Sequence, residues 1–142
     1  MLIREWEIKD IAEVAAIEKA SFSDPWNTDM ILSSFNLPIF TGLIAEENGK
    51  VVGYIGATHV FEDGEILLVA VEKTHRKKGV ATALLTQLSK TFAKCGVDKL
   101  FLEVRKKNSA ARACYAAFGF VEIGERVGYY GDDDAVLMEK TL

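Results

Sequence analysis

The chain has 142 residues and a mass of 15.7 kDa; 49% of its residues are hydrophobic, 27% are charged, and its formal net charge is −4. This length suits one domain, residues 1–142, and no segment reaches the about 20 consecutive apolar residues that a membrane-spanning helix needs. The acidic balance argues against a general nucleic-acid-binding protein, which usually has a basic excess.

A strand and two helices are predicted first. Residues 2–6 alternate between apolar and polar types as a strand does, and apolar residues recur at helical spacing over residues 8–17. An Asp-Pro dipeptide at 24–25 then breaks the chain. A second short helix is predicted over residues 27–35, because the Asn-Thr pair at its start provides a cap.

A β-meander follows these helices. Residues 40–46 and 51–61 are rich in β-formers, and between them lies Asn48-Gly49, a strong signal for a tight hairpin. A turn at residues 62–64 is expected to lead into an apolar strand over residues 65–71.

The remaining sequence predicts two helices and three strands. Apolar residues step by four from Val80 to Phe92, and Gly96 can end that helix. A strand over 99–104 precedes a helix that Asn108 or Ser109 can cap, and strands over 120–126 and 135–140 follow. This order predicts an α/β fold with a mixed sheet that is antiparallel at its start.

The turn between the strand ending at residue 71 and the helix beginning at Val80 is the most informative segment. It reads Arg76-Lys77-Lys78-Gly79-Val80-Ala81. A helix that opens from such a turn directs free backbone N–H groups and the positive end of its dipole at one point, which suits a phosphate. The alternative is an ordinary strand-to-helix turn with solvated basic residues.

Two other nucleotide-binding signatures do not fit this turn. A Walker loop needs Lys and then Ser or Thr after its last glycine, whereas Val80 and Ala81 follow Gly79. The dinucleotide fingerprint needs three glycines across the turn. The remaining pattern, Arg/Gln-x-x-Gly-x-Gly/Ala, belongs to acyl-CoA-binding proteins.

The N-terminus indicates a cellular location, and the cysteines and histidines bear on disulfides and metal binding. Charges from Arg4 onward interrupt any signal-peptide core, so we expect a cytoplasmic protein. Cys95 and Cys114 are too few for a disulfide framework, and neither they nor the two histidines have the spacing of metal ligands. We therefore expect no metal.

Several separate segments, in this order along the chain, point to one family. With the 76–81 turn, they resemble the GNAT family of N-acetyltransferases and, within it, the bacterial ribosomal-protein-alanine acetyltransferases. The segments are Ser21-Phe22-Ser23-Asp24-Pro25-Trp26, Leu102-Glu103-Val104-Arg105, Asn108 to Ala111, Cys114-Tyr115, Phe118-Gly119-Phe120, Tyr129-Tyr130, and Asp134-Ala135 with Met138.

The resemblance implies a fold, a reaction and a partner. The fold would be a mixed, mostly antiparallel sheet of about seven strands flanked by about four helices. The reaction would move the acetyl group of acetyl-CoA to the α-amine of a protein N-terminus, foremost the N-terminal alanine of ribosomal protein S18. No nucleic acid or membrane partner is implied.

The resemblance also assigns the residues that would hold acetyl-CoA. The strand backbone would pair with the pantetheine arm, and the following turn would hold the pyrophosphate. Asn108 would contact the same molecule, although a simple helix cap explains it equally well. The residues concerned are Val69, Ala70 and Val71 for the arm, and Arg76, Lys77, Lys78, Gly79, Val80, Ala81 and Thr82 for the pyrophosphate.

Acetyl transfer to an amine needs a base for the amine and benefits from an acid for the departing thiolate. Glu103 and Tyr115 stand at the family's positions for these two roles. Glu103 interrupts an apolar strand, which places its carboxylate in a cleft or, alternatively, on the solvent face of an edge strand. Tyr115 lies on an apolar helix stripe, where simple packing is the alternative.

On the acceptor side, the resemblance implies that Trp26, Tyr129 and Tyr130 line a slot for a small first residue. The acidic residues 132–134 would attract a basic tail, or form a solvated turn. Lys73, Leu68 and Gly131 depart from the family pattern, the last two on the acceptor side. Two alternatives therefore stay open: transfer to another amine, such as lysine, a polyamine or an aminoglycoside, and a non-catalytic acyl-CoA-binding module.

Overall fold

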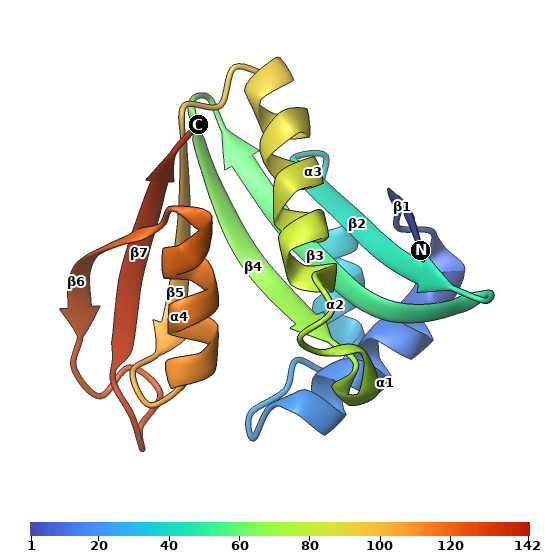
Figure 1. Ribbon diagram of the computed structural model, residues 1–142, viewed down its shortest axis with the longest axis horizontal. Coiled ribbons are helices and arrows are strands. Elements are labelled where there is room, and N and C mark those ends of the chain that lie inside the picture. Colours follow the sequence, from blue (N-terminus) through green and yellow to red (C-terminus); the bar gives the residue numbers. More distant parts are fainter.

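The computed structural model describes all 142 residues, and its centre is a seven-stranded sheet in the order β1-β2-β3-β4-β5-β7-β6 (Figure 1). Every neighbouring pair is antiparallel except β4 and β5, which are parallel. The predicted fold class is confirmed. The strands are β1 (Leu2–Glu5), β2 (Phe40–Glu47), β3 (Lys50–Val60), β4 (Asp63–Val71), β5 (Lys99–Arg105), β6 (Val121–Arg126) and β7 (Ala135–Thr141).

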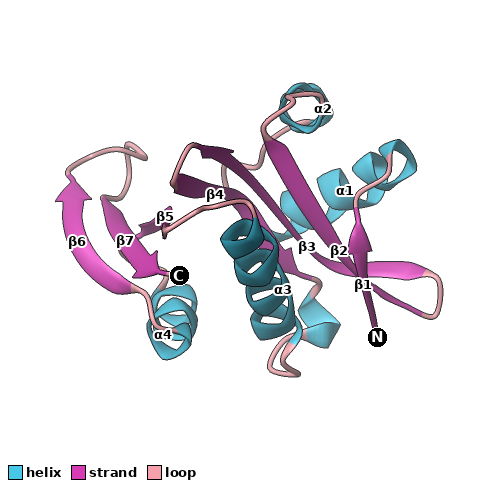
Figure 2. Ribbon diagram, turned by 90° about the horizontal axis from the view of Figure 1, so that it is seen from above, coloured by secondary structure: helices cyan, strands magenta, loops and turns pink.

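Four helices cover the two faces of this sheet. Figure 2 shows α1 and α2 on one face and α3 and α4 on the other. None of the helices is both long and apolar enough to cross a bilayer. They are α1 (Ile11–Ser21), α2 (Thr28–Phe35), α3 (Val80–Lys94) and α4 (Ser109–Phe118), with short 3-10 turns η1 (Ile8–Asp10) and η2 (Lys73–His75).

Local sequence signals explain most element boundaries. The side-chain oxygens of Asn27 and Asn108 accept hydrogen bonds from the third residue of α2 and α4, as N-caps do. Asn48 and Gly49 both have positive φ, at 53° and 77°, which is the geometry of a tight hairpin turn. The turn expected at residues 62–64 lies earlier, because Val60 pairs with Asp63 and leaves a two-residue loop.

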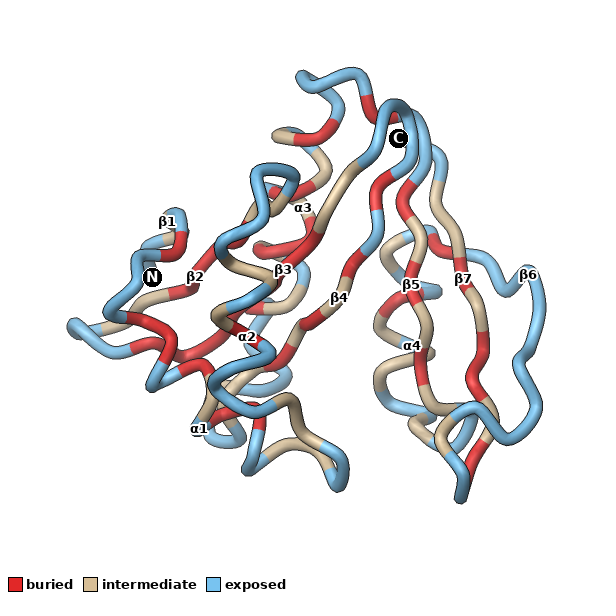
Figure 3. Tube along the Cα trace, turned by 180° about the vertical axis from the view of Figure 1, so that it is seen from behind, coloured by how far each residue is buried: buried red, intermediate tan, exposed pale blue.

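Each face of the sheet has its own apolar core, visible as buried strand segments in Figure 3. The larger core lies under α3 and α4 and includes Leu84, Leu88 and Phe92. The smaller core lies under α1 and α2 and includes Trp6 and Tyr54. The smaller core includes no residue of β5, β6 or β7, so on that face the helices cover only the first four strands. Polar side chains can reach solvent where this cover or the strand pairing is interrupted.

The pairing is interrupted between β4 and β5. Only Asp63, Gly64 and Glu65 pair with β5, opposite residues 99–101. Beyond them the two strands separate, as Figure 1 shows. The register of β3 and β4 shifts where Leu67 forms a β-bulge, which bends β4 at the point where it leaves β5. The result is an open strand edge in the middle of the sheet.

Candidate functional site

The backbone groups at the open edge of β4 follow from the hydrogen-bond pattern on its other side. Glu72 N–H donates to the Val52 carbonyl at 2.8 Å, and bonded pairs recur every second residue in an antiparallel ladder. Ala70, opposite Tyr54, is therefore bonded to β3, while Val69 and Val71 turn their N–H and C=O groups to the opening. The Ala70 backbone does not face the opening, contrary to our expectation.

The 76–82 turn directs free donors at the same opening. Gly79 caps α3 with φ 82°, and Lys77 also has a positive φ of 61°. No backbone carbonyl accepts from the N–H groups of residues 77–82. The Arg76 side chain donates instead to the Val71 carbonyl at 3.0 Å, so it holds the turn against β4. Arg76 thus has a structural partner, whereas the backbone donors are available to an anion.

Glu103 lies beside the opening, on β5. Its neighbours Leu102 and Val104 pack into the larger core, so the alternation of a strand turns Glu103 to the opposite face. β5 pairs with β7 along its length, but its pairing with β4 ends at Phe101, so Glu103 lies where β5 has an open edge toward β4. Arg126 of β6 lies 3.4 Å from Glu103 Oε1, while Glu103 Oε2 is buried without a hydrogen-bond partner.

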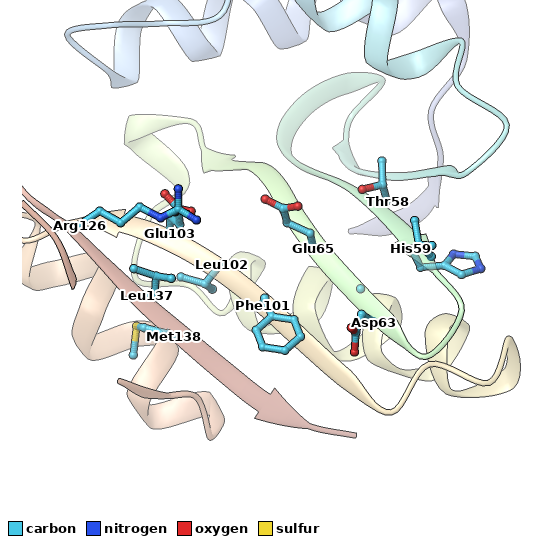
Figure 4. A pocket seen from close by; sticks show the side chains of 12 residues that line it. Thr58, His59, Asp63, Glu65, Phe101, Leu102, Glu103, Arg126, Leu137 and Met138 are labelled. Carbon is cyan, nitrogen blue, oxygen red and sulfur yellow. Dashed lines mark ion pairs between the residues drawn. The ribbon is translucent and has the colours of Figure 1, made fainter. Parts of the chain in front are cut away.

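A cavity of about 350 Å³ opens in front of Glu103 (Figure 4). Its walls come from β3, β4, β5, β6 and β7, and Figure 4 shows Glu65 and Glu103 on the same side of neighbouring strands. Asp63, Glu65 and Glu103 give the cavity three carboxylates against the single guanidinium of Arg126. Such a lining favours a cationic group, as a protonated amine is.

Tyr115 lies on α4 and belongs to the larger core, on the face of the sheet opposite the Glu103 side chain. It is buried on α4, where its ring packs edge to face against Phe120 with a centroid distance of 5.9 Å. Burial raises the pKa of the Tyr115 phenol, and the neighbouring Cys114 and Tyr130 raise it further. The phenol therefore keeps its proton at neutral pH and can act as a donor.

Tyr130 lies close enough to both Glu103 and Tyr115 to affect, or be affected by, their charges. Burial raises the pKa of its phenol, and the charge of Glu103 adds to that effect. Its ring lies under the Arg105 guanidinium at 4.4 Å and edge to face with Tyr129 at 5.0 Å. Tyr129 itself is exposed. The two tyrosines therefore lie next to Arg105 at the end of β5, and neither of them lines the cavity in front of Glu103.

Trp26 lies across from them, on the loop between α1 and α2. Its indole is half-buried against the smaller core, and its backbone N–H donates to Glu18 Oε2 at 3.1 Å. The buried Glu18 also accepts from the Tyr54 hydroxyl at 2.6 Å, and burial raises the pKa of this carboxyl. No local sequence pattern indicates this pair, which holds the loop that carries Trp26.

The acidic residues 132–134 have internal roles. Asp132 forms an ion pair with Arg105 at 2.7 Å. The buried Asp133 accepts from the Lys107 N–H, and Asp134 accepts from the Gly128 N–H. These carboxylates build the turn between β6 and β7, so they are not a free acidic surface for a basic tail. The carboxylates of Asp63 and Glu65, which line the cavity, form no ion pair or side-chain hydrogen bond of this kind.

Comparison with known proteins agrees with this geometry. Residues 11–120 match the Acetyltransferase (GNAT) family. An uncharacterized N-acetyltransferase of Methanocaldococcus jannaschii is 36% identical over 99% of this chain and 91% of its own length. The ribosomal protein bS18-alanine N-acetyltransferase of Escherichia coli K12 is 30% identical over 96% of this chain and 94% of its own.

Solved structures lead to the same family. The crystal structure of the E. coli ribosomal-protein-S18-alanine N-acetyltransferase superposes with a TM-score of 0.92 at 29% identity, covering 99% of this chain and 92% of that one. Ard1 from Thermoplasma volcanium gives a TM-score of 0.93, also at 29% identity, with 99% and 97% covered. This chain therefore belongs to the GNAT family and is an acetyl-CoA-dependent N-acetyltransferase.

Proposed function

We propose that the protein acetylates the α-amine of a protein N-terminus, and that the N-terminal alanine of ribosomal protein S18 is its acceptor. The observation that carries this proposal is Glu103 Oε2, an unpartnered carboxylate oxygen at the open edge between β4 and β5. It faces an acidic cavity of about 350 Å³, which can admit an ammonium group.

The residues on the two faces divide the chemistry. Acetyl-CoA supplies an acetyl group activated as a thioester. On the cavity side, Glu103 takes a proton from the acceptor amine, directly or through a water, so that the nitrogen lone pair can attack. On the α4 side, Tyr115 gives a proton to the departing sulfur. Between them, the Val69 N–H points into the opening and stabilises the negative charge that develops on the carbonyl oxygen.

The pyrophosphate is proposed to bind at the 76–82 turn, through the free N–H groups that no carbonyl of the protein accepts. Lys77 and Lys78 are exposed and add positive charge there. The amide nitrogen of the Asn108 side chain remains available as a donor while its oxygen caps α4, so one side chain can serve both the helix and the bound molecule.

Replacing Gly79 by alanine tests this assignment. Gly79 has φ 82° and open space around it, so a Cβ strains the turn and stands where phosphate oxygens must approach. We expect the Kd for CoA, measured by calorimetry, to rise about tenfold.

Gly49→Ala is the matched control, because Gly49 has a similar φ of 77° and equally open surroundings but lies in the β2–β3 hairpin. It should destabilise the fold to a similar degree and leave CoA affinity unchanged. Equal losses of CoA affinity in both variants would contradict a phosphate site at Gly79.

The names of the relatives support an N-terminal acceptor. Besides the bS18-alanine enzymes, an N-alpha-acetyltransferase of Sulfurisphaera tokodaii is 27% identical over 99% of this chain and 92% of its own length. Both kinds of name refer to acetylation of a protein α-amine. A relaxed N-terminal acetyltransferase is therefore the second candidate, and first-residue preference separates it from an S18-specific enzyme.

The test is a set of acceptors offered with acetyl-CoA. We expect mass spectrometry to find one acetyl group on the α-amine of a peptide with the S18 N-terminal sequence. Peptides that start with other residues measure how strictly the enzyme selects the first residue. Three further acceptors test the other amines: a peptide with a blocked N-terminus and a free lysine, a polyamine, and an aminoglycoside. Exclusive acetylation of one of these other amines would refute the proposal, and absence of any product would favour a non-catalytic acyl-CoA-binding module.

A further inference from the structure

Arg105 makes three contacts to groups that come from distant parts of the chain. Its guanidinium lies 3.0 Å from Asp24 in the loop between α1 and α2 and 2.7 Å from Asp132 in the turn between β6 and β7. The same guanidinium lies over the Tyr130 ring at 4.4 Å. Arg105 is the last residue of β5, two residues after Glu103, so its side chain turns to the same face.

The ion pair with Asp24 differs from all the others because it joins the two parts of the chain that lie on either side of the opening. β4 and β5 pair only at residues 63–65, and their other ends stand apart. Of the ion pairs in the structure, only Arg105–Asp24 joins residues 1–98 to residues 99–142; all others lie within one of these two parts. It therefore bridges the opening at the end far from the β4–β5 junction.

The two segments that Arg105 joins carry the aromatic residues of the acceptor side. Asp24 is two residues from Trp26, and Asp132 is two residues from Tyr130. A half-exposed ion pair adds little to the free energy of unfolding. The planar guanidinium of Arg105 can, however, hold two carboxylates and an aromatic ring in one arrangement. The ammonium group of a lysine, on its flexible side chain, does not do this.

We propose that Arg105 is a positioning residue that latches the α1–α2 loop to the β6–β7 turn and so sets the width of the acceptor entrance. The inference rests on the proposed function for its substrate side. The latch holds Trp26 and Tyr130 at a fixed separation, and an acceptor N-terminus enters between them to reach Glu103. Arg105 itself does not touch the reacting atoms.

Asp24→Asn is the variant that tests the latch. Asp24 is exposed, so the change leaves the fold intact while it removes the charge that bridges the opening. We expect the KM for the acceptor peptide to rise about tenfold, with the KM for acetyl-CoA unchanged, because only acceptor positioning is lost. Hydrogen–deuterium exchange should become faster in residues 22–27 and in residues 127–134.

Glu122→Gln is the matched control. Glu122 is similarly exposed and forms an ion pair with Arg112 at 2.6 Å, but this pair joins α4 to β6 away from the entrance. The control should change neither the acceptor KM nor exchange in the two segments. If Asp24→Asn behaves like Glu122→Gln in both measurements, the latch is refuted.

Arg105→Lys separates geometry from charge. We expect it to raise the acceptor KM as Asp24→Asn does, because lysine keeps the charge but not the fork. Wild-type behaviour of Arg105→Lys would refute the latch as stated. If the wild-type protein acetylates no peptide, the proposed function fails, and the latch is then judged by the exchange of the two segments alone.

Discussion

Replacing Tyr115 by phenylalanine is expected to lower kcat about 100-fold, the usual contribution of a positioned general acid. The ring is buried against Phe120, so phenylalanine preserves the packing and removes only the hydroxyl. Because burial raises the pKa of this phenol, it holds its proton throughout the working range of the enzyme. The variant should therefore bind CoA as the wild type does and release the thiol slowly.

Steady-state kinetics and calorimetry with CoA distinguish this role from packing. Cys114→Ala is the control, because Cys114 is the preceding residue of α4 and only half-buried; it should keep the wild-type kcat. If Tyr115→Phe loses CoA affinity or melts earlier while kcat per folded molecule is unchanged, the hydroxyl has no part in the reaction.

Glu103→Gln is expected to lower kcat/KM for the acceptor about 100-fold near pH 7. The amide keeps the size of the side chain but cannot take a proton from the amine. An α-amine has a pKa of about 8, so it is mostly protonated at neutral pH and mostly free above pH 9. The deficit of the variant should therefore shrink as pH rises, which a purely structural defect would not do.

Glu139→Gln is the control for this variant. The Glu139 side chain is 24% exposed, against 22% for Glu103. Each forms one long ion pair, Glu139 with Lys99 at 3.9 Å and Glu103 with Arg126 at 3.4 Å. Glu139 lies on β7 and does not line the cavity, so its replacement should leave the pH–rate profile unchanged. A deficit of Glu103→Gln that stays constant across pH would remove Glu103 from the role of base.

The sequence predicted those parts of the fold that depend on near neighbours. Asn48-Gly49 forms the expected hairpin, Asn27 and Asn108 cap their helices, and Gly79 opens α3 with positive φ. Each of these depends on the conformational preference of one or two residues. The family resemblance added a mostly antiparallel sheet of about seven strands, but not the order of the strands, which local preferences do not determine either.

Contacts between distant segments could not be predicted in this way. The sheet order β5-β7-β6 places β6 one strand away from β5, so the long side chain of Arg126 can extend across β7 to Glu103. No local sequence pattern indicates that order. The orientation of Ala70 depends on the register with β3. The acidic residues 132–134 look like a solvated surface in the sequence, yet Asp132 pairs with Arg105, and the carboxylates of Asp133 and Asp134 accept hydrogen bonds from backbone N–H groups.

The brief junction of β4 and β5 has a consequence for the lifetime of the enzyme. Three residue pairs hold these strands together, and an acyl donor bound between them, as we propose, would supply further hydrogen bonds to the open edge of β4. A ligand at a thousandfold excess over its Kd stabilises a folded protein by about 4 kcal/mol. If the donor binds there, its removal should leave the folded protein less stable and more readily cleaved by a protease.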